Sequence, residues 1–156
     1  MAQTADLSPT IVEALYSEAL ELADRVRAAF DLSGRLTAAS EDEDLARIAL
    51  SCEALRTTTR MMHAIAWLLN QRAYFAGELS EFQLRRHGRL PPRQRDAAPD
   101  QLALLSPELI ELIERTRRFY ARIERLDGAW RDHFAMHPAA IHRLRERLGS
   151  AVAQLH

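Results

Sequence analysis

The sequence predicts an all-α protein, an antiparallel three-helix bundle of long helices with short extra helices. Alanine occurs 26 times and leucine 23 times, against 7 isoleucines and 3 valines, so helix formers greatly outnumber the residues that suit sheets. Three long segments repeat apolar residues every three or four positions, and each begins at a capping residue. The 156 residues are enough for one domain with a buried core, and we expect a single helical domain over residues 1–156.

The first long helix is predicted over residues 9–32. Ser8 is a suitable N-cap, and Pro9 fits the first helical position because its missing N–H would have no partner there. An apolar stripe follows at steps of three and four, and Gly34 is the expected stop. The stripe consists of Ile11, Leu15, Ala19, Leu22, Val26 and Phe30.

The second long helix is predicted over residues 41–76, between a capping box at Ser40 and Glu43 and a stop at Gly77. Residues 61–69 are apolar on almost every side, so this helix needs more than one neighbour, and we expect a homodimer. Unbroken steps of three and four predict a heptad seam on one face. The predicted seam comprises Leu45, Ile48, Cys52, Leu55, Thr59, Met62, Ala66, Leu69 and Ala73.

The remaining chain is predicted to hold a short helix over 80–87, a loop over 88–105, a third long helix over 107–135 and a short C-terminal helix over 138–148. Ser106 caps the third long helix, and Gly128 marks a place where it can break or kink. The three long helices are expected in up-down-up order. The third seam comprises Leu109, Leu112, Thr116, Phe119, Ile123, Leu126 and Trp130.

The formal net charge of -1 conceals a division along the chain. Residues 1–44 carry ten acidic residues and three arginines, whereas residues 45–156 carry twelve acidic residues and eighteen arginines. Two surfaces of opposite sign favour association with proteins. All 21 basic residues are arginine, which excludes Schiff-base chemistry and a P-loop lysine, although coding bias is the simplest cause of this composition.

Catalytic motifs are missing from the sequence, which has neither a glycine-rich phosphate loop nor a GxSxG nucleophile. The single Cys52 lies on the predicted seam, so we expect a buried structural thiol. His133 and His137 have the i, i+4 spacing of helical zinc ligands, but Pro138 breaks the helix directly after them. We therefore expect no enzymatic activity and no cofactor, and we regard these two histidines as weak candidates for metal binding.

The basic segment over residues 85–95 suggests an alternative function. Its arginines are suited to contact nucleic-acid phosphates, but no aromatic residue is interleaved after Phe82 and no recognition-helix motif precedes it. We favour contact with solvent or protein and keep a small nucleic-acid-binding regulator and a structural dimer as alternatives. The arginines of this segment are Arg85, Arg86, Arg89, Arg93 and Arg95.

Threonines interrupt two of the predicted seams. Thr59 and Thr116 occupy equivalent positions in the second and third long helices, which predicts a polar layer that fixes their register. Arginines flank both positions and present guanidinium groups suited to carboxylates of a partner protein. These flanking arginines are Arg56, Arg60, Arg115, Arg118, Arg122 and Arg125.

Several segments around these positions resemble the alphaproteobacterial regulator of CtrA degradation (RcdA-like) family over about residues 9–130. The segments are Leu-Arg-Thr-Thr-Thr-Arg-Met-Met at 55–62, Ala-Trp-Leu-Leu at 66–69, Gln-Arg-Ala at 71–73, Gly-Glu at 77–78, Tyr-Ala-Arg-Ile at 120–123 and Arg-Leu-Asp at 125–127. The resemblance implies a dimeric three-helix bundle without enzymatic activity. It also implies an adaptor that works with a response-regulator adaptor to deliver cell-cycle substrates to the ClpXP protease. The tail beyond Trp130 departs from the family, where it is variable or disordered, because here it has a partly helical pattern.

We therefore expect a non-enzymatic adaptor that binds cargo proteins together with protease or co-adaptor proteins. A cytoplasmic location is expected, because the N-terminus lacks the basic start and apolar core of a signal peptide, and no membrane span is expected. Trp67 is expected to be an apolar contact or, more in keeping with its position, a core residue. The polar contacts to partners are predicted at Arg56, Arg60, Arg72, Arg122 and Arg125.

Overall fold

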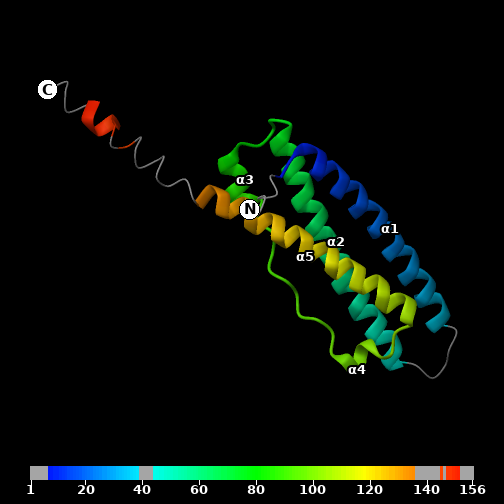
Figure 1. The fold of residues 1–156 in the computed structure, drawn as a ribbon. Helices are drawn as coiled ribbons and strands as arrows, with labels where there is room; N and C mark the ends of the chain where they lie inside the picture. Colours follow the sequence, from blue (N-terminus) through cyan, green and yellow to red (C-terminus); the bar gives the residue numbers. More distant parts are fainter. Residues whose placement is uncertain (1–6, 39–43, 136–144, 146, 152–156) are drawn as a thin grey trace, which may run out of the picture.

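The computed structural model describes residues 7–38, 44–135, 145 and 147–151, and these residues form helices and loops without a strand. The all-α class is confirmed. Three long helices make a bundle: α1 (Pro9–Ala38), α2 (Asp44–Phe75) and α5 (Pro107–Ala135). Two short helices, α3 (Glu81–His87) and α4 (Pro99–Leu102), lie near opposite ends of it (Figure 1).

The directions of the long helices differ from the expected up-down-up order. Helix α1 is antiparallel to both other helices, but α2 and α5 run parallel (Figure 1). Arg60 bonds to Thr116 and Trp67 bonds to Asp127, so residue numbers rise together along the two helices. The chain reaches this arrangement because the long segment between α3 and α5 returns along the bundle before α5 begins. Short connections would have given antiparallel neighbours.

The predicted apolar faces of α1 and α5 are largely confirmed. Residues of α1 at positions 15, 19, 22 and 26 are buried, although Val12 rather than Ile11 fills the first core position. On α5, Thr116 and Phe119 lie in the core together with Leu109 and Ile123. The larger of two core clusters contains Val12, Leu15, Ala19, Leu22, Met61, Ala64, Trp67, Leu68, Leu90, Phe119, Tyr120 and Ile123. The smaller contains Ala49, Leu50, Leu105, Leu109 and Ile113.

The predicted seam of α2 is wrong, because its large residues point to solvent. Leu45 is 74% exposed, Leu55 70% and Met62 63%, and Cys52 is half-buried. The core face of α2 lies on roughly the opposite side of the helix and includes three polar residues. It consists of Ala49, Leu50, Glu53, Thr57, Met61, Ala64, Trp67, Leu68 and Gln71. A pattern that ranks faces by apolar content selects the outer face, because Glu53, Thr57 and Gln71 lower the apolar content of the face that is buried.

Helix boundaries follow the predicted caps with some exceptions. Gly34 does not stop α1, which continues to Ala38, and α5 passes through Gly128 without a break. Gly77 follows α2 as predicted, with φ of 78° in the left-handed region that glycine adopts without steric cost. Helix α4 lies within the segment expected to be a loop. The cap at 40–43 and most of the predicted helix 138–148 lie outside the described residues, although 147–151 are helical.

Serine side chains stabilise the starts of three helices. The Ser8 hydroxyl accepts a hydrogen bond from the Ile11 N–H at 3.3 Å, and Ser106 does the same for Leu109. Ser80 forms a capping box with Gln83, in which each side chain accepts a hydrogen bond from the other residue's N–H. These local bonds explain why the predicted starts at 9, 80 and 107 agree with the structure to within a residue.

Gln71 is a polar residue in the core without a hydrogen bond from its amide group. Its side chain is fully buried, and neither amide atom has a partner among the described residues. A buried amide without a partner costs free energy, and a similar-sized apolar side chain removes that cost. We expect Gln71→Met to raise the free energy of unfolding by about 1 kcal/mol in urea denaturation at fixed protein concentration. Half-buried Asn70→Met is the control, with a change within about 0.5 kcal/mol. Destabilisation by Gln71→Met would contradict this assignment.

Candidate functional site

The segment over residues 88–98, here called the covering loop, lies over the contact between the parallel helices α2 and α5. Leu90 and Ala97 bury their side chains near its two ends. The Tyr120 hydroxyl donates a 2.6 Å hydrogen bond to the Pro91 carbonyl oxygen, and the Arg93 Nε donates a 2.7 Å bond to Glu124. The basic loop is thus attached to α5 through one neutral and one charged hydrogen bond.

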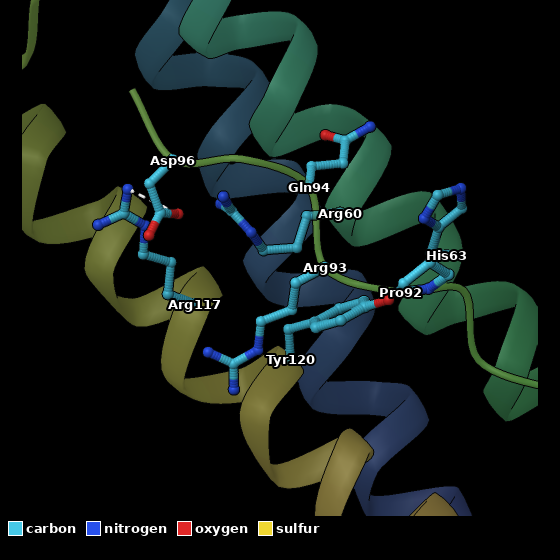
Figure 2. A pocket seen from close by; sticks show the side chains of 8 residues that line it. All are labelled: Arg60, His63, Pro92, Arg93, Gln94, Asp96, Arg117 and Tyr120. Atoms are coloured by element: carbon cyan, nitrogen blue, oxygen red, sulfur yellow. Dashed lines mark ion pairs between the residues drawn. The ribbon is translucent and has the colours of Figure 1, made fainter. Parts of the chain in front are cut away.

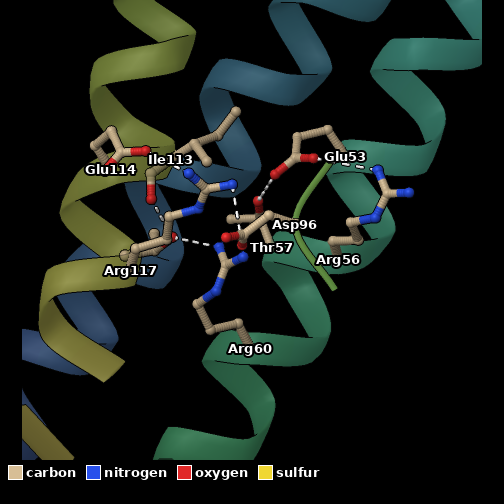
Figure 3. Close-up of polar contacts among 9 residues, drawn as sticks. Glu53, Arg56, Thr57, Arg60, Asp96, Ile113, Glu114 and Arg117 are labelled. Carbon is tan, nitrogen blue, oxygen red and sulfur yellow. Dashed lines mark hydrogen bonds and ion pairs between the residues drawn. The ribbon is translucent and has the colours of Figure 1, made fainter. Parts of the chain in front are cut away.

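A polar layer joins α2 to α5 beneath this loop (Figure 3). The Arg60 guanidinium donates a 2.8 Å hydrogen bond to the Thr116 hydroxyl, which donates at 2.7 Å to the Ile113 carbonyl oxygen. Thr116 is fully buried, as its seam position predicts. The expected partner Thr59 is only half-buried, and Arg60 takes its place because Arg60 lies on the side of α2 that faces α5.

A buried carboxylate lies on the same face of α2. Glu53 is 1% exposed and accepts hydrogen bonds from the Thr57 hydroxyl and the Arg56 guanidinium, each at 3.4 Å. Thr57 is fully buried and is therefore the threonine of the 57–59 run that lies inside the core. A buried charge is stable only with such partners, which accounts for the arginine and threonine one helical turn after Glu53.

Arg117 of α5 connects the polar layer to the covering loop. Its guanidinium pairs with Asp96 of the loop at 3.1 Å and with Glu114 one turn earlier on α5. Burial and the nearby charge of Arg117 together lower the pKa of Arg60, while Glu53, Asp96 and Glu114 act in the opposite direction. Two guanidinium groups therefore lie close enough to repel each other in a partly buried site.

A cavity of about 50 Å³ lies between the covering loop and these helices (Figure 2). The Tyr120 phenol is its one hydroxyl, and burial together with nearby Glu124 and Asp127 raises the pKa of that phenol. The one proton of this phenol is already donated to the Pro91 carbonyl oxygen, but the three guanidinium groups are hydrogen-bond donors. The lining is therefore suited to binding negative groups rather than to nucleophilic chemistry. The lining residues are Arg60, His63, Pro92, Arg93, Gln94, Asp96, Arg117 and Tyr120.

The residues predicted to contact partners do not form one surface. Arg72 donates to Glu13 at 2.6 Å and Arg122 to Glu18 at 2.8 Å, so both arginines tie α1 to its neighbours. Arg56 and Arg60 belong to the internal network described above, and Arg125 is exposed.

Trp67 is a core residue, with 2% of its surface exposed. Its indole N–H donates a 2.9 Å hydrogen bond to Asp127, which also accepts from Arg131. Trp67 therefore has no surface available to a partner in this fold, and its role is to join α2 to α5.

A second basic site lies at the α3 end of the bundle and is here called the basic hollow. It is lined by Phe82, Arg85, Arg86, Arg89 and Arg131. Phe82 is 70% exposed beside these guanidinium groups, so the hollow presents an apolar ring within a positive surface. The sequence had indicated the arginines of residues 85–95 but had not separated those of the hollow from Arg93, which is bonded to Glu124.

The metal hypothesis concerns residues near the end of the described chain. His137 lies outside the described residues, as does the side chain of His133. Among the residues that the structure describes, no group of three or more histidine, cysteine or acidic side chains is arranged to hold a metal ion. Across all the described residues, none of the helices has the length and apolar character needed to cross a membrane.

Comparison with known proteins places this helical bundle in a family. Residues 3–152 match the family described as "Protein of unknown function (DUF1465)", and the chain belongs to that family. No curated protein matches the chain. No solved structure matches it either.

Proposed function

We propose that the protein is a non-enzymatic, cytoplasmic adaptor that binds cargo proteins and promotes their delivery to the ClpXP protease during cell-cycle control. The resemblance to the RcdA-like family supports this proposal, and it extends over about residues 9–130 of the matched residues 3–152. The fold is compatible with it, because an adaptor needs surfaces that bind two proteins and no bond-making groups. Tethering raises the effective concentration of cargo near the protease, which is sufficient to speed its degradation.

The observation that carries the proposal of a protein-binding role is an apolar face of α2 that none of the described residues covers. Five large side chains project from this face and form what is here called the outer stripe. Contiguous apolar surface of this kind is uncommon on monomers and marks contact sites for proteins. The outer stripe consists of Leu45, Ile48, Leu55, Met62 and Leu69, whose exposed fractions run from 43% to 74%. It extends over about 36 Å of helix.

A second copy of the chain is the proposed occupant of the outer stripe, through an antiparallel contact of two α2 helices. The stripe follows the heptad spacing with which helices pair in coiled coils. If the two helices cross near Thr57, Leu45 meets Leu69 of the second copy and Leu55 meets Thr59. At both ends Asp44 then lies near Arg72 of the second copy, a contact of opposite charges in which Arg72 keeps Glu13 of its own α1 as a further partner.

The basic hollow is the proposed site for an acidic segment of cargo or co-adaptor. Exposed Phe82 supplies an apolar anchor, and Arg86 and Arg89 supply positive charge beside it. Aromatic and arginine side chains contribute disproportionately to binding energy in protein interfaces. The same cluster of arginines beside an aromatic ring is also the observation in favour of a nucleic-acid-binding regulator. Binding to DNA that weakens as the salt concentration rises, and that is lost in Arg89→Ala, would support that alternative.

The adaptor proposal predicts faster proteolysis of a cell-cycle substrate when this protein is added to ClpXP and the response-regulator adaptor. Degradation is followed by the loss of substrate on gels. The double variant Arg86→Glu and Arg89→Glu is expected to reduce the stimulation at least tenfold, because it reverses the charge of the hollow. The double variant Arg25→Glu and Arg27→Glu reverses two exposed arginines of α1, is the control matched in charge, and is expected to stimulate like the unchanged protein.

Two results would contradict the adaptor proposal. One is an unchanged degradation rate together with no association between this protein and ClpX or its substrates in a pull-down. The other is equal loss of stimulation in the hollow and control variants, which would show an effect of total charge rather than of this site.

A further inference from the structure

The cavity beneath the covering loop is bordered by three guanidinium groups from three different segments. Arg60 comes from α2, Arg117 from α5 and Arg93 from the loop, and Figure 2 shows them around the same space. Arg93 forms an ion pair with Glu124, and Arg117 forms ion pairs with both Asp96 and Glu114. Among the described residues, Arg60 has no carboxylate within 4.0 Å and only the Thr116 hydroxyl as a hydrogen-bond partner.

Three carboxylates balance the three guanidinium charges in number, but among the described residues none of them pairs with Arg60, which lies in a partly enclosed space. Burial and the nearby charge of Arg117 lower the pKa of Arg60. The Nε of Arg117 is buried and has no hydrogen-bond partner among the described residues. An unused buried donor beside a second guanidinium is an arrangement that an anion between the two would satisfy.

We propose that this cavity binds a tetrahedral oxyanion, a phosphate ion or a phosphoryl group, between Arg60 and Arg117 and beneath Arg93. Several oxygen atoms pointing in different directions match guanidinium groups that approach from three segments, which the two oxygens of a planar carboxylate do not. The volume of about 50 Å³ admits roughly three or four water-sized groups, comparable to the oxygens of one phosphate.

One acidic residue must be accommodated when the anion enters. Asp96 lines the cavity and pairs with Arg117, but its side chain is 66% exposed. The carboxylate therefore has room to turn toward solvent, and the Arg117 guanidinium can then bind the anion in place of Asp96. This inference does not depend on the adaptor function, because it rests on the cavity alone.

Titration calorimetry with inorganic phosphate, in chloride buffer of matched ionic strength, tests the proposal. We expect saturable binding of one ion per chain and, for Arg60→Gln, an affinity at least about tenfold lower, because charge-assisted hydrogen bonds are lost. Arg125→Gln removes an exposed arginine of α5 away from the cavity and is expected to bind like the unchanged protein. Phenyl phosphate identifies the source: equal binding indicates a phosphoryl end group, and binding of phosphate alone indicates the free ion.

Absence of saturable phosphate binding by the unchanged protein would overturn the proposal. Unchanged binding by folded Arg60→Gln, or equal weakening by Arg125→Gln, would overturn it as well, because either result places the ion elsewhere. Circular dichroism establishes whether Arg60→Gln is folded. If it is not, Arg93→Gln is used, since Arg93 lies on the exposed side of the cavity and its loss is expected to weaken binding several-fold without unfolding the bundle. Full affinity in that variant would also overturn the proposal.

Discussion

Replacing Trp67 with alanine is expected to lower the free energy of unfolding by about 3–5 kcal/mol. Trp67 has the largest side chain among the fully buried residues of the described chain, so its removal leaves a large cavity between α2 and α5. The change also removes the indole donor to Asp127, whose carboxylate then keeps, among the described residues, its contact with Arg131. Urea denaturation at fixed protein concentration measures the effect, with the midpoint and slope analysed separately.

Two further variants separate the causes of this loss. Trp67→Phe keeps an aromatic ring but removes the indole N–H, and we expect about 1.5–3 kcal/mol of destabilisation from the lost bond to a charged group. Phe82→Ala removes an exposed ring and is expected to change the free energy of unfolding by less than about 0.5 kcal/mol. A Trp67→Ala protein as stable as Phe82→Ala would show that Trp67 does not join the two helices.

The second large effect is expected on the outer stripe of α2. The unchanged protein is expected to be a dimer in analytical ultracentrifugation, and the double variant Leu55→Glu and Met62→Glu is expected to be a folded monomer. Four carboxylates would then face one another in the dimer, where their desolvation and repulsion prevent association. Both positions are solvent-exposed within one chain, so the helical content in circular dichroism is expected to stay unchanged.

The control for this experiment is Leu20→Glu, which changes an exposed leucine of α1 that lies outside the stripe. This variant is expected to remain dimeric. A monomeric unchanged protein would refute the dimer, and a dimeric Leu55→Glu and Met62→Glu variant would place the contact on another face.

Cross-linking distinguishes the direction of the helices in the dimer. In the antiparallel pairing, Leu55 of each copy lies opposite Thr59 of the other, so a mixture of Leu55→Cys and Thr59→Cys proteins, both in a Cys52→Ala background, is expected to form a disulfide dimer on oxidation, and neither variant alone is expected to do so. Native Cys52 is expected to form none, because its two copies lie about 15 Å apart along the axis. Cross-linking through Cys52 would instead indicate a parallel pairing.

Much of the fold was predictable from local signals. Ser8, Ser80 and Ser106 each cap a helix through their own hydroxyl groups, and such contacts need no information from distant parts of the chain. The apolar faces of α1 and α5 were predictable because each of these helices has one strongly apolar side. Helix α2 has two, and its more regular apolar face lies outside while Glu53, Thr57 and Gln71 lie inside.

The candidate sites were predictable only in part, for the same reason. The seam position of Thr116 identified one member of the polar layer, but Arg60 rather than Thr59 completes it. Arginines were visible in the loop, yet no sequence pattern indicated that Arg93 and Asp96 would lie over Arg60 and Arg117. Their approach follows from the parallel course of α2 and α5, which requires the covering loop to return between them.

The helical class, most helix ends and the inward faces of α1 and α5 depend on residues within a few turns of one another and can be predicted from local sequence. The buried side of α2, the direction of α5 and the cavity under the covering loop depend on contacts between distant parts of the chain. These features depend on which polar groups find partners across the bundle, as Arg60 finds Thr116 and Trp67 finds Asp127. The buried Thr116 hydroxyl and the buried Trp67 indole are stabilised by these two contacts, and in each contact the partner lies more than fifty residues away in the chain.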